Sequence, residues 1–380
     1  MQGVLLPALL HPPTSKGKIA SMKKVKVELG SNSYDVRVGA GLLARMGIWL
    51  KEMGFSGKAT IITDTTVKGL YGDTLNQGLT SAGFNVTTLE VPAGEEYKSL
   101  ETAGRLYHEL TSSYAERNTP VLALGGGVIG DLAGFVAATY MRGVPLIQVP
   151  TTLLAQVDSS IGGKTAVDSG QLKNVIGAFY QPRLVIADIN TLKTLPEAEL
   201  SNGMAEVIKS AAIRNKHFFH FLDLNLGNVR LLNAAVLEEI VLETARIKAE
   251  IVEKDEKDLG LRSLLNFGHT IGHALETVSN FQIKHGQAVA IGMTAAARIS
   301  HKMGTLDERE VIWLTDVIKK AGLPTEMPDL NMGEIIAAMK HDKKVVQDKV
   351  RFVLLKSIGE AFITDEASLA LVEEVLVGQE

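Results

Sequence analysis

Two histidines, His269 and His273, stand four residues apart in the stretch NFGHTIGHALE, which occupies positions 266 to 276. Residues at this spacing share one face of a helix, so the two imidazoles could chelate one zinc ion. The metalloprotease form of this motif has a glutamate directly after the first histidine, whereas Thr270 follows His269 here. Surface or hydrogen-bonded core histidines account for the same spacing, so the pair alone leaves its chemistry open.

Further metal ligands are available elsewhere in the C-terminal half. The stretch ELSNGMAEVIKSAA places Glu206 and Lys209 on neighbouring positions of one helix face, where a structural ion pair is the plain alternative. The spacings of Arg262, Asn266, His269 and His273 predict one polar stripe on a single apolar helix. His285 begins the next helical run, and Glu206 with two of the three histidines would leave an open position on a catalytic zinc.

A glycine-rich turn marks the N-terminal half. In VLALGGGVIGDLAGF, an apolar run leads into Gly125, Gly127 and Gly130, which satisfy the GxGxxG spacing of a dinucleotide-binding turn. A tight turn without a ligand is the alternative, and the stretch 145 to 157 lacks the carboxylate that the ordinary fingerprint has for the ribose. Asp64, at the end of ATIITD, could take that role.

Two further segments carry charged groups that suit anionic ligands. Glu95 and Lys98 stand three residues apart in GEEYKS, where they could touch a cofactor or be solvated. The segment from Pro150 to Asn174 contains hydroxyls, Asp158, Lys164 and Lys173 but little periodicity after Val157, and it predicts an irregular active-site loop. Its lysines suit a phosphate or carboxylate, although solvated lysines are the alternative.

Composition narrows the function classes. The 380 residues carry a net charge of −4, which excludes a general basic field for nucleic acid. Cysteine is absent, so disulfides and thiolate catalysis are excluded, a metal must use histidines and carboxylates, and a reducing cytoplasmic compartment is expected. No apolar run reaches the roughly 18 residues that span a bilayer, so no membrane partner is expected. We expect residues 1–21 to be a disordered extension, because the segment that begins at Met22 looks like a natural start of the protein.

The elements that would position these residues form two parts. From 22 to 190, short β-rich runs alternate with helical stretches such as 41–53 and 98–115, which predicts a largely parallel sheet in an α/β layer. From 191 to 380, long amphipathic runs at 229–254, 285–303 and 306–321 predict a mostly helical part, with a small hairpin in VRFVLLKSIGEAFI. The sequence predicts a Rossmann-like α/β nucleotide-binding domain followed by a mainly α-helical metal-binding domain, with the boundary near residue 190.

The glycine turn, GGKTAVD, NGMAEVIK, NFGHTIGHALE and KHG follow one another in an order that resembles the 3-dehydroquinate synthase family of sugar phosphate cyclases. The resemblance covers nearly everything after Met22. It implies a dehydroquinate synthase-like fold, bound NAD+ and a Zn2+ or Co2+ ion held by Glu206, His269 and His285. His273 would not bind the metal and would serve substrate hydrogen bonding or proton transfer instead.

The reaction implied by the resemblance belongs to the shikimate pathway of aromatic amino acid biosynthesis. It closes 3-deoxy-D-arabino-heptulosonate 7-phosphate, a phosphorylated sugar acid, to 3-dehydroquinate with loss of phosphate. The steps would be transient oxidation by NAD+, phosphate elimination, return of the hydride, ring opening and aldol closure. The resemblance also implies a homodimer, in which Arg142 would reach the phosphate from the partner subunit.

The resemblance also assigns individual positions. The substrate would contact Lys164, Asn174, Lys209, Lys248, Arg262, Asn266, His273, Arg142 and either Lys343 or Lys344. The dinucleotide would contact Asp64, Glu95, Lys98, Gly126, Gly127, Asp131, Thr151, Thr152, Asp158, Lys164, Lys173, Thr194, Leu195 and Glu199.

Three competing functions remain. A metal-dependent alcohol or glycerol dehydrogenase would not need so many lysines and arginines. A related cyclase that makes an inosose or valiolone acts on substrates without the carboxylate, which Arg262 and the HDKK segment would bind. A non-catalytic nucleotide-binding protein would leave the Glu/His/His set unexplained.

Overall fold

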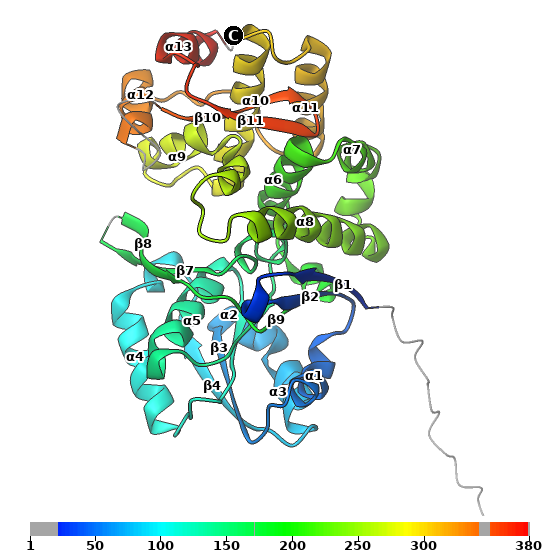
Figure 1. Cartoon of the computed structure of the whole chain (residues 1–380), viewed down its shortest axis with the longest axis vertical. Helices are drawn as coiled ribbons and strands as arrows, with labels where there is room; N and C mark the ends of the chain where they lie inside the picture. Colours follow the sequence, from blue (N-terminus) through cyan, green and yellow to red (C-terminus); the bar gives the residue numbers. More distant parts are fainter. Residues whose placement is uncertain (1–21, 171, 342–349, 379–380) are drawn as a thin grey trace, which may run out of the picture.

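The computed structural model describes residues 22–170, 172–341 and 350–378. The expected N-terminal extension, Lys343 and Lys344 lie outside this range. Two parts stack along the long axis of the molecule, an α/β part and a mainly helical part (Figure 1). The predicted fold class is confirmed.

Within the described residues, seven strands form one sheet in the order β1-β2-β9-β6-β5-β3-β4. All neighbouring pairs are parallel except the antiparallel pair β1–β2. The strands are β1 (Lys23–Val27), β2 (Tyr34–Gly39), β3 (Lys58–Asp64), β4 (Asn85–Val91), β5 (Val121–Gly125), β6 (Leu146–Pro150) and β9 (Leu184–Asp188).

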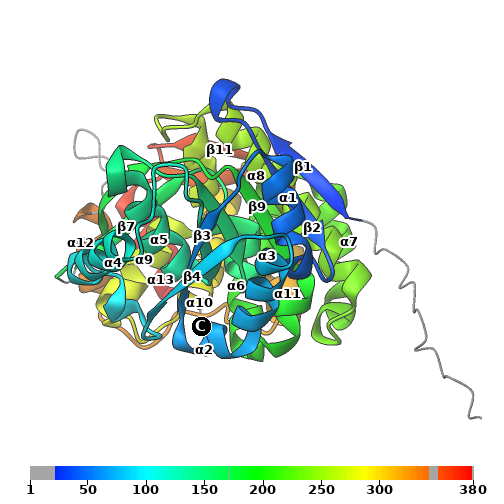
Figure 2. The same ribbon diagram turned by 90° about the horizontal axis from the view of Figure 1, so that it is seen from below.

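Helices cover both faces of the sheet, because the central strands are apolar on both sides. On one face, Leu106 of α4 and Leu132 of α5 share a core with Ile62. On the other, Trp49 of α1 and Leu79 of α3 share a core with Ile61. The helices of this part are α1 (Met46–Glu52), α2 (Thr65–Val67), α3 (Asp73–Thr80), α4 (Leu100–Ser112) and α5 (Gly127–Thr139). Figure 2 shows the two helical layers on opposite sides of β3.

The second part begins after the short 3-10 helix Ile189–Thr194, which leads from β9 to α6. The domain boundary expected near residue 190 stays a prediction. The helices are α6 (Glu197–Arg214), α7 (Lys216–Arg230), α8 (Ala234–Lys254), α9 (His269–Val278), α10 (His285–Lys302), α11 (Glu308–Lys320), α12 (Met332–His341) and α13 (Leu369–Val377). The late hairpin is confirmed as β10 (Phe352–Ser357) and β11 (Glu360–Thr364).

Two expectations about local structure were wrong. The segment after Pro150 is not irregular, because a helical turn at Ala155–Ser159 leads to a hairpin of β7 (Lys164–Ser169) and β8 (Leu172–Phe179). Most of β8 is exposed, so the strand lacks the apolar alternation that reveals a half-buried strand.

The polar residues from Arg262 to His273 do not lie on one helix either. A 3-10 helix, Leu261–Asn266, ends before α9, and between them Gly268 has a left-handed backbone with φ of 80°. A β-carbon on Gly292 of α10 would lie 2.0 Å from the Gly268 carbonyl oxygen, so α9 and α10 pack with their backbones almost in contact. The close approach requires glycine at position 292. The left-handed backbone at Gly268 interrupts the single helix that was predicted from Arg262 to His273.

Candidate active site

The chemically distinctive side chains meet where the carboxyl ends of the strands face the helical part. In parallel α/β sheets, ligands bind in the crevice outside these strand ends. Lys248 of α8 donates to the backbone oxygen of Asp158 at 2.7 Å and to its carboxylate at 2.5 Å. A residue that follows β6 is thereby joined to the helical part.

Three possible metal ligands converge from three helices. Glu206 lies in the middle of α6, whereas His269 and His285 are the first residues of α9 and α10. The Nε2 atoms of His269 and His285 lie 3.4 and 3.3 Å from the same Glu206 oxygen, Oε1. The three ligand atoms all lie within 4.8 Å of one another, as required for joint binding of one ion.

The Glu206 carboxylate is 1% exposed, and neither oxygen has a hydrogen-bond partner among the described residues. It forms an ion pair with Lys209, one turn further along α6. Burial alone would raise the pKa of Glu206, but Lys209 and then His285 outweigh burial and lower it to about 2. The carboxylate is therefore ionised and lacks the hydrogen bonds that a buried charge requires.

The two histidines are oriented for metal binding through Nε2. The Nδ1 atom of His269 lies 3.2 Å from the Phe267 carbonyl oxygen, and Nδ1 of His285 lies 3.4 Å from Oε2 of Glu276. Hydrogen bonds at Nδ1 leave the Nε2 lone pairs directed toward Glu206. With the unsatisfied carboxylate, this donor set fits Zn2+ or Co2+ and leaves positions for substrate oxygens.

His273 lies on the same face of α9 as His269, with the two ring centroids 5.2 Å apart. It belongs to a second possible cation set with Glu276 and His285. The expectation that His273 is not a ligand stays a prediction.

Further basic side chains follow from Lys209, the partner of Glu206, through Lys248 to Arg262. Burial lowers the pKa of Lys248 to about 8, since the opposing effect of Asp158 is incomplete. Arg262 is buried and donates to the carbonyl oxygens of Gly162 and Glu256 at 3.1 and 2.6 Å. Lys164, at the start of β7, forms an ion pair with Asp258. The region therefore concentrates cations where an anionic substrate could bind.

Asn266 is the last residue of the 3-10 helix that precedes α9. It lines a small hollow with Gly268, Gly292 and Phe352, beneath α9 and β10. Its expected contact with substrate stays a prediction.

The glycine turn has the geometry expected for a dinucleotide. Gly125 ends β5, Gly126 caps α5, and Gly127 is the first residue of that helix. A β-carbon on Gly126 would lie 3.1 Å from the Thr152 side chain, and one on Gly127 would lie 3.2 Å from Ser159 Oγ. The amino end of α5 can therefore accept a pyrophosphate against bare backbone.

Lys98 organises a second polar cluster beside this turn. It is 4% exposed, donates to Asn174 Oδ1 at 2.8 Å and lies 2.8 Å from Glu95. Asp131 and Asp168 lie 3.6 and 3.7 Å from its Nζ atom. Burial raises the pKa of Asp131 to about 7, because Lys98 offsets the effect only in part. Four expected residues, Glu95, Lys98, Asp131 and Asn174, are thus brought together.

Other expected cofactor residues are distributed around the strand ends. Asp64 Oδ1 accepts the backbone N–H groups of Thr66 and Val67, so this carboxylate also caps α2. Thr151 and Thr152 directly follow β6. Thr194 pairs with the Tyr71 hydroxyl at 2.5 Å, Glu199 pairs with Lys284 at 2.5 Å, and Lys173 lies over the Phe281 ring at 4.3 Å. Leu195 connects Thr194 to α6.

Among the described residues, Arg142 is an expected site residue that lies away from the site. It is exposed beyond the carboxyl end of α5, whereas the glycine turn lies at the amino end of that helix. A helix of this length separates the two ends by about 20 Å. A role for Arg142 within the same subunit is therefore not supported by its position.

Two carboxylates of the site were missed from the sequence, Asp168 and Glu276. Glu276 stands three residues after His273 and seven after His269, so its spacing could have placed it on the same helix face. Asp168 accepts the N–H of Asn174, whose backbone is left-handed with φ of 55°. Without knowledge of the hairpin, spacing gave no signal for this contact.

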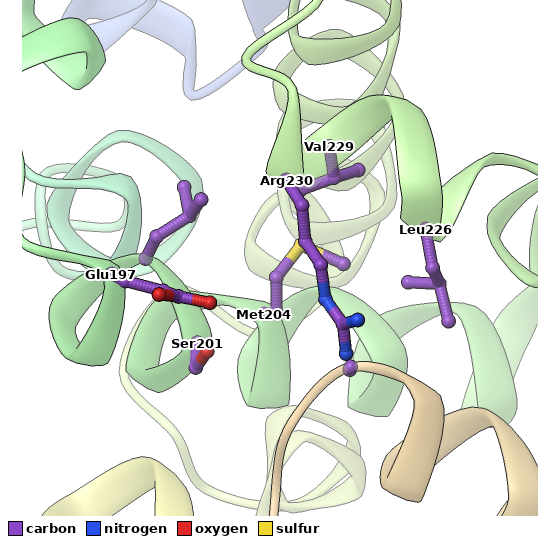
Figure 3. Close-up of a pocket in the computed structure, with 8 residues that line it drawn as sticks. Glu197, Ser201, Met204, Leu226, Val229 and Arg230 are labelled. Atoms are coloured by element: carbon purple, nitrogen blue, oxygen red, sulfur yellow. The ribbon is translucent and has the colours of Figure 1, made fainter.

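A hollow between α6, α7 and the end of α11 contains none of these residues. Figure 3 shows Arg230 extending from α7 toward the end of α11, where it donates to the Lys320 carbonyl oxygen. The hollow is lined by Glu197, Leu200, Ser201, Met204, Leu226, Val229, Arg230 and Ala321. These mainly apolar walls do not form a second charged site.

Comparisons with solved structures agree with the fold and the donor set. The 2-epi-5-epi-valiolone synthase ValA from Streptomyces hygroscopicus subsp. jinggangensis 5008, with NAD+ and Zn2+ bound, superimposes with a TM-score of 0.84. It is 28% identical, with 92% of this chain and 96% of that chain covered. A 2-deoxy-scyllo-inosose synthase complexed with carbaglucose-6-phosphate, NAD+ and Co2+ gives a TM-score of 0.86 at 27% identity, covering 93% and 99%. The fold is therefore that of the sugar phosphate cyclases.

The family follows from the sequence comparisons. Residues 88–202 match the family model described as 3-dehydroquinate synthase N-terminal, and residues 203–345 match the C-terminal one. A 3-dehydroquinate synthase from Dehalococcoides mccartyi (strain CBDB1) is 51% identical over 344 residues, which cover 90% of this chain and 96% of the relative. The chain belongs to the 3-dehydroquinate synthase family.

Proposed function

We propose that the chain converts 3-deoxy-D-arabino-heptulosonate 7-phosphate to 3-dehydroquinate and phosphate, with bound NAD+ and a Zn2+ or Co2+ ion. The observation that carries this proposal is the buried Glu206 carboxylate, unsatisfied and shared by His269 and His285, beside a group of cations. It is supported by the 51% identity to a 3-dehydroquinate synthase. The reaction is that of a carbon–oxygen lyase that eliminates phosphate.

Each part of the site has a distinct task in this proposal. NAD+ supplies a reversible hydride acceptor, and the metal supplies a Lewis acid for substrate oxygens. Glu206, His269 and His285 hold the ion. The glycine turn holds the pyrophosphate with Asp64, Glu95, Lys98 and Asp131 around the rest of the dinucleotide.

The cations would bind the two ends of the substrate. Lys209, which is paired with Glu206, and Lys164, which begins the β7–β8 hairpin, would engage the phosphate, and Arg262 suits the carboxylate. Lys248 remains largely protonated at neutral pH, since its pKa is about 8. It can donate hydrogen bonds to substrate oxygens, and His273, beside His269, can accept or return a proton.

The assembly and location also belong to this proposal. Because Arg142 lies at the far end of α5, its phosphate contact requires a homodimer in which it serves the partner's site. No described helix is long and apolar enough to cross a membrane. We propose a cytoplasmic enzyme with the NAD-binding domain at residues 22–190.

One assay tests the function. Purified full-length protein loaded with NAD+ and Zn2+ receives the heptulosonate phosphate while released phosphate and NADH absorbance are followed together. We expect phosphate to accumulate over many turnovers while NADH stays at or below the enzyme concentration, because the hydride returns to its carbon. NADH formed in proportion to product would instead support a dehydrogenase.

A control distinguishes the related cyclases. Glucose 6-phosphate, a phosphorylated sugar without the carboxylate, should release no phosphate above background. Turnover of glucose 6-phosphate but not the heptulosonate phosphate would contradict the proposal.

A further inference from the structure

Glu276 lies on the metal-facing side of α9. It follows His269 by seven residues and His273 by three, so the three side chains share one helix face. Its side chain is 13% exposed, and Oε2 lies 3.4 Å from Nδ1 of His285 on the neighbouring helix α10. The carboxylate thus links the two helices that supply the histidine ligands.

The contact determines which nitrogen of His285 can bind a metal. A neutral imidazole carries one N–H, and a carboxylate at Nδ1 stabilises the tautomer with the proton on that atom. The lone pair of Nε2, 3.3 Å from Glu206 Oε1, is then available to the ion. His269 achieves the same orientation through the Phe267 carbonyl oxygen, so only the His285 partner can be removed by substitution.

Geometry separates this role from direct coordination by Glu276. Glu206 and Glu276 lie against opposite nitrogens of the His285 ring, and one ring cannot direct both nitrogens at the same ion. Glu206 is almost fully buried without a hydrogen bond among the described residues, whereas Glu276 is more exposed and is bonded to the ring. The ion therefore belongs on the Glu206 side.

We propose that Glu276 is a positioning residue, which orients His285 by accepting its Nδ1–H and so increases metal affinity. The inference rests on the proposed metal site of Glu206, His269 and His285. Carboxylates that hydrogen-bond metal-binding histidines typically contribute 10- to 100-fold to metal affinity. No step of the reaction requires Glu276 to touch the substrate.

The test uses metal-stripped full-length protein titrated with Co2+ against a competing chelator, with the visible spectrum of bound Co2+ recorded. Glu276→Ala should weaken Co2+ binding by about 10- to 100-fold. Glu276→Gln should lose less, because its amide oxygen can still accept the Nδ1–H. Glu276→Met keeps a similar side-chain length but has no strong acceptor, so it should weaken Co2+ binding as Glu276→Ala does. It separates loss of the hydrogen bond from any destabilisation of the fold by the smaller alanine side chain.

The matched control is Glu373→Ala, which removes an exposed carboxylate from α13 of the same helical part. It should bind Co2+ as the wild type does. Unchanged Co2+ affinity and spectrum in both Glu276→Ala and Glu276→Met would overturn the proposal. If the single variants Glu276→Gln and His273→Ala each lose the ion completely, the proposal is also overturned, because Glu276 would then be a ligand.

The metal site itself is tested separately with His285→Ala. If that variant binds Co2+ as tightly as the wild type, the proposed ligand set fails. If His285→Ala loses the ion while the Glu276 variants keep it, only the positioning role fails.

Discussion

At the scale of single residues, the site depends on buried charges that compensate one another. Glu206, Lys209 and Lys248 are 1%, 2% and 6% exposed. Removing one partner of such a buried pair typically costs about 3–5 kcal/mol, because the other charge remains without compensation. Substitution of Glu206 or Lys209 would therefore confound loss of stability with loss of function. His273 and Asp131, which are less enclosed, allow clearer tests.

His273→Ala should retain one metal ion per chain and lose turnover, whereas His269→Ala should lose the ion. The reason is that Glu206 and His285 directly face the Nε2 atom of His269, while a fourth protein ligand would occupy a position that substrate oxygens need. Metal content by elemental analysis and phosphate release measure the two outcomes. A metal-free His273→Ala protein would contradict the assigned ligand set.

We expect the Asp131 carboxyl to make a pH-dependent contribution to the free energy of unfolding. Burial raises the pKa of its carboxyl to about 7, above the ordinary value of 3.8 that applies in the unfolded chain. The folded state therefore binds this proton more tightly, and the stabilisation is complete below about pH 4 and is lost as pH rises through about 7.

Asp131→Asn cannot ionise, so its melting temperature relative to the wild type should increase between pH 4.5 and pH 8. Thermal unfolding of the cofactor-free proteins at a series of pH values measures this difference. A difference that stays constant over the range would show that burial does not disfavour the Asp131 carboxylate.

At the scale of elements, the positions of α9 and α10 depend on the contact of Gly268 with Gly292. Gly292→Ala would place a β-carbon 2.0 Å from a backbone oxygen that cannot rotate away. Overpacking of a core typically costs about 1–3 kcal/mol, and a backbone clash should reach the upper end. Because the helices would separate at the ends that carry His269 and His285, metal affinity should also decrease.

Gly227→Ala provides the control, since no atom lies within 4 Å of a β-carbon at this exposed position of α7. There the same substitution should raise stability by about 0.5–1 kcal/mol, through the higher helix propensity of alanine. Chemical denaturation and Co2+ titration of both variants test the pair. Equal effects of the two substitutions would rule out close packing as the cause.

The sequence predicts a helix or strand well where its apolar residues recur with a regular period. It predicts poorly where a tertiary contact determines the local structure. The alternation of β-rich runs and helices in the N-terminal half and the helical run at 285–303 were predicted, because their apolar patterns are clear. The hairpin β7–β8 was not, because its exposed second strand is held by pairing and by the Asp168–Asn174 hydrogen bond. The break before α9 was also missed, since the Gly268 contact comes from a helix later in the chain.

The same reasoning applies to the candidate site. The Glu/His/His set could be proposed from residue types, but spacing alone did not decide between His269 and His273. Their distinction came from family resemblance. The structure adds the Glu276 contact, which depends on how two helices pack and therefore has no signature in the sequence of either helix alone.

At the scale of the whole molecule, the metal set joins three helices whose mutual positions the core also fixes. Removal of the ion should lower the melting temperature without unfolding the chain, because Lys209 and His285 still compensate Glu206. Addition of Zn2+ or Co2+ at about 100 times its dissociation constant should increase stability by about 2.7 kcal/mol. Thermal unfolding after chelation and after restoration measures the change.

Magnesium is the appropriate control for that experiment. It prefers six oxygen ligands in octahedral geometry, so it should not replace Zn2+ or Co2+ at a site with two histidine nitrogens. Equal recovery with Mg2+ would indicate a non-specific cation effect and would contradict the site.

The order of strands in the sheet has a consequence for synthesis on the ribosome. The first hairpin, β1–β2, reaches the rest of the sheet only through β9, and its buried side chains Val25 and Val27 share a core with α8. Lys23 pairs with Glu239, and the backbone N–H of Glu28 donates to Glu253 at 2.8 Å. Strands β1 and β2 leave the ribosome first, but their buried face cannot pack against α8 until the chain has been synthesised as far as Glu253. The N-terminal layer cannot be completed as an independent unit during translation, and its outer edge is finished by the part of the chain made later.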